Sequence, residues 1–133
     1  MRAKSDRIFL ILFLAYLGMV VWCCFGHFDS LPKVQKDLFG IPTDKVVHFV
    51  MFLPFVFLFY MSFASLPRRR AQALLLAFGA LAAGALMAVA TELGQSLTTY
   101  RSGDAWDFAA DAAGLGVALV CVLIIIFTNK RLS

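Results

Sequence analysis

Nine ionisable or amide side chains of this sequence are of the types that bind polar ligands and move protons. They are Asp44, Lys45, His48, Glu92, Gln95, Arg101, Asp104, Asp107 and Asp111. A histidine beside carboxylates can act as a general base and exchange protons. Lysine and arginine can hold a phosphate or a carboxylate through charge-assisted hydrogen bonds. We therefore treat these nine residues as a candidate ligand-binding site, with His48, Glu92 and Asp107 as its candidate catalytic residues.

The spacing of these residues predicts that they share helix faces. Residues three or four positions apart are neighbours on one face of a helix. The groups with this spacing are Asp44 with His48, Glu92 with Gln95, and Asp104 with Asp107 and Asp111. At 1.5 Å of rise per residue, Asp111 would lie about 6–10 Å below the end of its helix. Its depth would match that of Glu92 and His48, so we expect the three to face one pocket.

Four apolar runs must position these side chains. The 133-residue chain is 62% hydrophobic and 15% charged, whereas soluble proteins carry about 25% charged residues. Each run is close to the roughly 20 residues that span a bilayer. We predict an all-α, polytopic four-transmembrane-helix bundle, a single domain over residues 1–133, with helices at about 8–25, 44–66, 71–97 and 104–127. Pro54 lies inside the second helix and should bend it.

Burial in a membrane makes ionisable side chains energetically costly. An ionisable side chain near the centre of a membrane helix costs roughly 2.5–3.5 kcal/mol on insertion scales. A carboxylate at that depth stays charged only if it is paired or hydrated, because desolvation favours its protonated form. The cations available to the five carboxylates are Lys45, His48 and Arg101. We expect a crowded, acidic pocket.

Basic residues predict the orientation. One face of the membrane would carry eight of them: Arg2, Lys4, Arg7, Arg68, Arg69, Arg70, Lys130 and Arg131. The other face would carry four: Lys33, Lys36, Lys45 and Arg101. The positive-inside rule then places both termini in the cytoplasm. The candidate pocket would open away from the cytosol.

Several classes of function are disfavoured by the composition. The net charge of +4 is modest and its basic residues lie near helix ends, so nucleic acid is not an expected partner. Cys23, Cys24 and Cys121 show no zinc-binding spacing. We predict no resident metal and no cofactor. The first apolar run lacks a small-x-small cleavage site, which favours a retained helix over a signal peptide.

The order of the polar motifs resembles that of the VanZ-like family, small bacterial membrane proteins named for an accessory of glycopeptide resistance. The matching residues are Asp44-Lys45-x-x-His48-Phe49, Glu92-x-x-Gln95, Arg101, Asp107, Asp111 and Gly114. The resemblance covers residues 44–116 and implies a multi-pass protein of the bacterial inner membrane that affects the cell envelope and teicoplanin tolerance. Asp111 departs from it, because many relatives have asparagine there, and makes this site more acidic.

Three hypotheses for the polar residues follow. The first is a non-enzymatic membrane protein that contacts membrane lipids. Its outward pocket would bind an envelope glycolipid, a peptidoglycan precursor or a glycopeptide. The second is a membrane-embedded enzyme acting on a lipid or cell-wall precursor. His48 would be its base or nucleophile and Glu92 or Asp107 would orient it; one version adds a divalent cation held by His48, Glu92, Asp107 and Asp111. The third is structural: polar contacts that only fix helix packing. Ion conduction is disfavoured, because the inner helix halves lack an ionisable relay.

Overall fold

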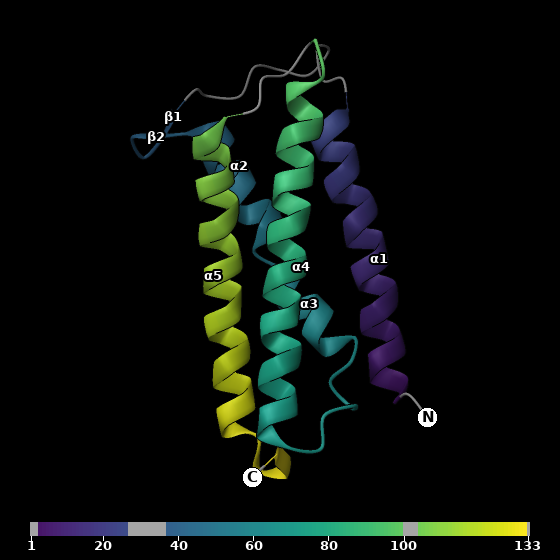
Figure 1. Ribbon diagram of the computed structural model, residues 1–133. Helices are drawn as coiled ribbons and strands as arrows, with labels where there is room; N and C mark the ends of the chain where they lie inside the picture. The colour runs from purple at the N-terminus through teal and green to yellow at the C-terminus, as the bar shows by residue number, and fades with distance from the viewer. Residues whose placement is uncertain (1–2, 27–36, 100–103, 133) are drawn as a thin grey trace.

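Helices lying side by side along one axis make up most of the computed structural model (Figure 1), which describes residues 3–26, 37–99 and 104–132. Within these residues, four spans are long and apolar enough to cross a membrane: Lys4–Phe25, Thr43–Met61, Arg70–Ser96 and Ala105–Thr128. The predicted all-α, four-span membrane fold is confirmed. The protein is a multi-pass membrane protein, and helix α1 (Lys4–Phe25) begins at the same end of the bundle at which α5 (Ala105–Thr128) ends.

The second span is interrupted near its middle, at Pro54. It consists of α2 (Thr43–Phe52) and α3 (Phe55–Met61). Proline has no backbone N–H to continue the helix, and its ring clashes with the carbonyl four residues earlier. Helical structure also ends at Met61 and not at residue 66 as expected, because the next amides bond to carbonyls three residues back, as Phe63 N does to Tyr60 O at 3.1 Å.

Helix α4 (Arg70–Ser96) packs through a stripe of small residues. Ala80, Gly84 and Ala88, which the sequence presents at every fourth position, are all buried. A Cβ at Gly84 would lie 2.5 Å from a methyl carbon of Leu115 and 3.0 Å from the ring of Phe55. Small side chains thus let α5 and α3 approach α4 closely, as membrane helix pairs commonly do.

Helix α5 approaches α2 closely at Gly114. A Cβ there would collide with the carbonyl oxygen of Phe49 and lie 3.2 Å from the amide nitrogen of Leu53. Both are backbone atoms, so no side-chain movement could relieve the overlap. Gly114 therefore fixes how near α5 can lie to α2, the helix that carries Lys45 and His48.

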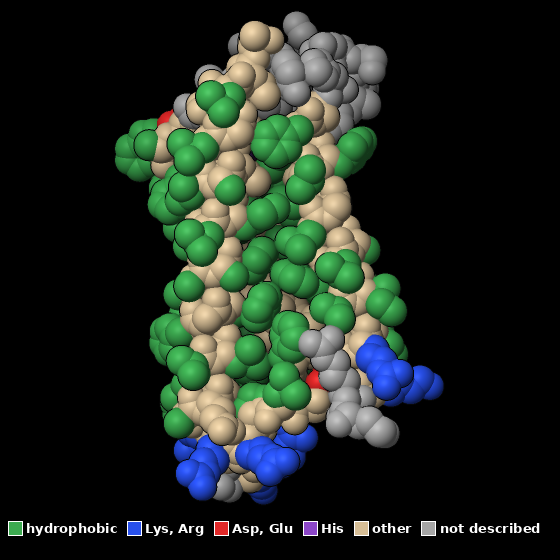
Figure 2. Space-filling view, turned by 45° about the vertical axis from the view of Figure 1, so that its right-hand side comes forward, with side chains coloured by type: hydrophobic (Ala, Val, Ile, Leu, Met, Phe, Trp, Pro, Cys, Tyr) green, Lys and Arg blue, Asp and Glu red, His purple; other side chains and the backbone are tan. Residues whose placement is uncertain are grey.

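The two ends of the bundle differ in charge. On the face shown in Figure 2, hydrophobic side chains cover the length of the bundle, and Lys and Arg side chains gather at the end where α1 and α4 begin. The described residues of this basic end are Lys4, Arg7, Arg68, Arg69, Arg70, Lys130 and Arg131. The last two belong to a short 3-10 turn, η1 (Lys130–Leu132).

A two-stranded hairpin precedes α2 at the opposite end. Strand β1 (Asp37–Leu38) pairs with β2 (Ile41–Pro42) in antiparallel register. Phe39 and Gly40 form the turn with φ of 52° and 79°, and positive φ at both central residues is the hairpin geometry that fits twisted strands. The hairpin delivers the chain directly into α2 at Thr43.

Candidate functional site

Seven polar residues from three helices meet at the end of the bundle away from the basic residues. We call them the polar cluster: Asp44, Lys45 and His48 of α2, Glu92 of α4, Asp104 at the start of α5, and Asp107 and Asp111 within α5. Helix α5 packs against both α2 and α4. Residues about 60 positions apart are thereby brought into direct contact.

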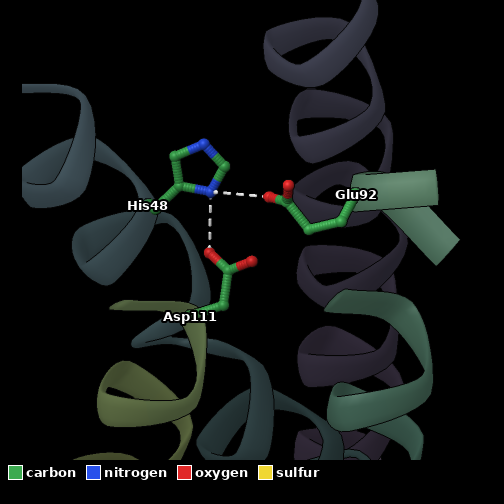
Figure 3. A group of neighbouring side chains, drawn as sticks. All are labelled: His48, Glu92 and Asp111. Carbon is green, nitrogen blue, oxygen red and sulfur yellow. Dashed lines mark hydrogen bonds and ion pairs between the residues drawn. The ribbon is translucent and has the colours of Figure 1, made fainter. Parts of the chain in front are cut away.

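His48 lies at the centre of the cluster. Its Nδ1 is 2.9 Å from Oδ1 of Asp111 and 3.6 Å from Oε1 of Glu92 (Figure 3). Its Nε2 faces the other way, 3.6 Å from Oδ2 of Asp107. The histidine is 6% exposed and Asp111 is fully buried. One imidazole thus contacts carboxylates of both α4 and α5, with a different set at each ring nitrogen.

Lys45 is the cation that holds the outer part of the cluster. Its Nζ donates to Asp44 at 3.0 Å, to Asp104 at 2.7 Å and to Asp107. The hydrogen bond from Lys45 is the main reason that the pKa of the Asp104 carboxyl lies below its ordinary value. Asp107 uses one oxygen for Lys45 and places the other near His48, so it links the two basic side chains.

Asp104 also organises the start of α5. Its side chain accepts a hydrogen bond from the backbone amide of Trp106 at 3.0 Å, which caps the helix. Its own backbone N–H donates to Oε2 of Glu92 at 3.1 Å. Glu92 therefore ties α4 to the first residue of the α5 cap, while its second oxygen points toward His48.

Two buried carboxylate oxygens of the cluster have no hydrogen-bond partner. They are Oε1 of Glu92 and Oδ2 of Asp111. A buried acceptor without a donor costs roughly 1–3 kcal/mol, and more when it is charged. Oε1 of Glu92 lies 3.6 Å from Nδ1 of His48, whereas the oxygen of Asp111 that contacts Nδ1 is the other one, Oδ1 (Figure 3). The described part of the chain thus leaves acceptor capacity unused at the deepest point of the site.

Of the remaining two predicted site residues, the structure describes Gln95, which is not in the cluster. Gln95 is buried, but its Nε2 donates to the backbone carbonyl of Cys24 on α1 at 3.1 Å. Three residues on a helix correspond to a rotation about 60° short of a full turn, and α1 occupies the direction that Gln95 faces. Arg101 lies outside the described residues.

An open, largely apolar cavity of about 360 Å³ lies beside the cluster. We call it the α4–α5 groove. Its lining consists of Val89, Glu92, Leu93 and Ser96 of α4 with Asp104, Ala105 and Phe108. Glu92 and Asp104 belong to both the groove and the polar cluster. The groove was not predicted from the sequence, although Val89, Leu93 and Ser96 recur at the three- and four-residue spacing of one helix face.

Three further hydrogen bonds, made by two buried side chains, were not predicted from the sequence. Tyr16 of α1 donates its hydroxyl proton to the backbone carbonyl of Met51 at 2.5 Å. At the basic end, Asp6 accepts from the hydroxyl of Ser65 and from its backbone N–H. Apolar periodicity carries no signal for any of them, because each pairs residues from distant segments.

Comparison with known proteins identifies the family of this chain. Residues 8–127 match the family described as VanZ/LLP1. The chain belongs to the VanZ/LLP1 family. The family match covers nearly the whole chain, whereas the resemblance drawn from the motifs covered residues 44–116, and it confirms that resemblance.

The VanZ/LLP1 chain is also similar to a protein of the yeast Schizosaccharomyces pombe, described as "Uncharacterized protein C11E3.10". The two are 33% identical over 135 residues, which is 99% of this chain and 69% of the yeast protein. No solved structure gives a significant match. Because this relative comes from a yeast, similarity at this level is not confined to bacteria.

Proposed function

We propose that this VanZ/LLP1 protein binds a membrane lipid, with the headgroup at the polar cluster and part of an acyl chain in the α4–α5 groove. One observation carries the proposal: Glu92 and Asp104 line the groove and are at the same time members of the cluster. A lipid has the same division, since a polar headgroup joins directly to an apolar chain. Concave, mostly apolar sites with a few placed polar groups are typical of ligand pockets.

The charges of the cluster indicate the headgroup chemistry. Among the described residues, five carboxylates face one lysine and one histidine, and the lysine already contacts three of the carboxylates. Ionised carboxylates only accept hydrogen bonds. A headgroup that donates, through an ammonium group or sugar hydroxyls, therefore suits the site better than a bare phosphate. Phosphatidylethanolamine and glycolipids satisfy this requirement.

A lipid-retention experiment tests the proposal. The purified chain is reconstituted with equal amounts of phosphatidylethanolamine, phosphatidylglycerol and a diglycosyl lipid, and the lipids that remain bound are measured by native mass spectrometry. Leu93→Trp fills the groove, and Leu86→Trp is its matched control because Leu86 is exposed on the same helix two turns away and does not line the groove. We expect Leu93→Trp to reduce retention about tenfold and Leu86→Trp to retain lipid normally. Equal retention by both variants would contradict the proposal.

The orientation and the membrane form a narrower part of the proposal. The basic residues gather at the end where α1 begins and α5 ends, and the positive-inside rule supports cytoplasmic termini. In the inner membrane of a bacterium the polar cluster would then face the cell wall, within reach of an envelope glycolipid, a peptidoglycan precursor or a glycopeptide. Membrane-impermeant thiol labelling of Phe39→Cys, at the exposed hairpin turn, tests this in a cysteine-free background; labelling in intact cells is expected.

Tolerance of teicoplanin is the matching cellular readout. Expression in a sensitive host should raise the inhibitory concentration of teicoplanin, and His48→Ala should abolish the increase because the central side chain of the cluster is lost. Lys4→Met, at an exposed position of the basic end, is the control. An unchanged inhibitory concentration with the wild-type chain would separate lipid binding from antibiotic tolerance.

Catalysis on a lipid is the second candidate, and the position of His48 favours it. Its Nδ1 contacts Asp111 and its Nε2 faces Asp107, so the imidazole is oriented as a general base often is. Mass spectrometry of labelled lipids incubated with the protein tests this alternative. Conversion that disappears in His48→Ala supports an enzyme, and retention without conversion supports binding alone.

A further inference from the structure

Three potential ligand atoms from three helices converge beside His48. A nitrogen of His48, a carboxylate oxygen of Glu92 and a carboxylate oxygen of Asp111 all lie within 4.8 Å of one another. The contacts measured from Nδ1 of His48 are 2.9 Å to Asp111 and 3.6 Å to Glu92. Adjacent ligands of a divalent ion bound at about 2.1 Å lie about 3.0–3.4 Å apart. The two contacts of Nδ1 are therefore already near the separation that one ion requires.

The unpartnered oxygens are an independent observation that points to a cation. Asp111 is fully buried, and its Oδ2 has no hydrogen-bond partner; the same holds for the buried Oε1 of Glu92. Figure 3 places both carboxylates around the same side of the imidazole. Burying such groups without compensation is costly. A bound cation would satisfy both oxygens at once.

The far side of the imidazole has the arrangement common in metal-binding histidines. Such a histidine usually donates its other ring N–H to a carboxylate or carbonyl, which fixes the tautomer and aims the ligating nitrogen. Oδ2 of Asp107 lies 3.6 Å from Nε2 of His48, and Asp107 is itself held by Lys45. Nδ1 is then the nitrogen that faces the two carboxylates of the site.

We propose that His48, Glu92 and Asp111 bind one divalent first-row transition-metal ion, which joins α2, α4 and α5 at the polar end of the bundle. Imidazole with carboxylates suits Zn²⁺ and Mn²⁺, whereas Mg²⁺ and Ca²⁺ favour sites built only from oxygen. Three protein ligands leave further coordination positions for water or a ligand. The proposal does not depend on lipid binding, because the three ligands all come from the protein.

Direct metal binding tests the proposal without any assumption about activity. The full chain is stripped with a chelator in detergent, dialysed against buffered free Zn²⁺ or Mn²⁺, and its metal content is measured by mass spectrometry. We expect about one Zn²⁺ per chain, tighter than Mn²⁺ according to the usual order of affinities. Glu92→Gln and Asp111→Asn should each weaken Zn²⁺ binding at least about tenfold, because each removes a charged ligand.

Matched controls separate this site from other zinc-binding groups. Asp44→Asn removes a carboxylate that contacts Lys45 and does not belong to the three ligands. His27→Ala removes the second histidine of the sequence, and serine at all three cysteines removes the thiols. All three controls should bind Zn²⁺ as the wild type does. Loss of bound zinc in the cysteine-free variant or in His27→Ala would overturn the proposal.

A second readout covers variants that fold poorly. An ion that binds only the folded state raises the melting temperature, so excess Zn²⁺ should stabilise the wild type and Asp44→Asn but not Asp111→Asn. Binding of Co²⁺ to the wild type should produce visible absorption bands that are absent in Asp111→Asn. No Zn²⁺ bound by the wild type, or equal binding by Asp111→Asn, refutes the site and leaves the three residues as a hydrogen-bonded packing cluster.

Discussion

Two buried carboxyl groups at opposite ends of the bundle are held in different ways. Asp6, in the first turn of α1, is 2% exposed and accepts hydrogen bonds from the hydroxyl and the backbone N–H of Ser65. Asp111 is equally buried, yet one of its oxygens has no partner and the other contacts a histidine that two more carboxylates approach. Asp6 is satisfied by neutral donors of a nearby turn, whereas Asp111 belongs to a crowded set of like charges.

The difference separates a packing contact from a candidate site. One acid at the N-terminus of a helix benefits from the helix dipole and needs few donors. In the part of the site that the structure describes, five carboxylates surround two basic side chains and repel one another, which is unfavourable for stability unless another cation or ligand compensates. Function therefore is to be sought where burial is imperfectly compensated, and the Asp6–Ser65 pair provides the internal control.

Removing the cation of the polar cluster should have the largest effect. In Lys45→Met, the buried carboxylate of Asp107 loses its charged donor, and we expect the free energy of unfolding to fall by about 3 kcal/mol. Unfolding in mixed detergent and SDS micelles, followed by circular dichroism, measures it. Lys4→Met at the exposed basic end should change little. Equal, small effects would remove the distinction between the two ends.

The close approach of α5 to α2 comes next in size. Gly114→Ala places a methyl group against the backbone of Phe49 and Leu53, and should lower the free energy of unfolding by about 1–3 kcal/mol. Gly116→Ala is the matched control, because a Cβ there meets nothing within 4 Å. The same unfolding assay applies. If Gly114→Ala is as stable as the wild type, the contact between α2 and α5 does not fix the geometry of the cluster.

Matched amide substitutions compare the two buried acids directly. Asp6→Asn weakens charge-assisted hydrogen bonds from Ser65 and should cost about 1 kcal/mol. Asp111→Asn keeps an acceptor for His48 and removes negative charge from the crowd, so metal-free protein should lose less than Asp6→Asn does, or gain stability. Thermal melts after chelator treatment measure both. A larger loss for Asp111→Asn would mean that it, too, is an ordinary packing contact.

An effect on stability alone is expected at Gln95. Gln95→Leu removes the donor to the Cys24 carbonyl in the last turn of α1, and should lower the free energy of unfolding by about 0.5–1.5 kcal/mol. Zinc binding and lipid retention should stay at wild-type levels, because Gln95 faces α1. Loss of zinc binding or of lipid retention in this variant would mean that Gln95 does belong to the site.

Helix periodicity and membrane energetics could predict most of the polar cluster. The three- and four-residue spacings placed Asp107 with Asp111 and Asp44 with His48, and hydropathy alone predicted four membrane spans. Periodicity does not say which neighbour a helix face meets. The pairing of Gln95 with α1, the contacts of Lys45 with three carboxylates and the α4–α5 groove depend on how the helices are rotated and arranged, which is decided by close packing at Gly84 and Gly114.

The interruption at Pro54 divides the second span into two separate helices, α2 and α3. Aromatic contacts of Phe55 with Phe13 and Tyr16 hold the part that follows it against α1. The ten-residue helix α2 carries both basic side chains of the cluster. A tilt of α2 would move Lys45 and His48 together. It would change their distances to the carboxylates of α4 and α5, while the basic end of the bundle kept its shape.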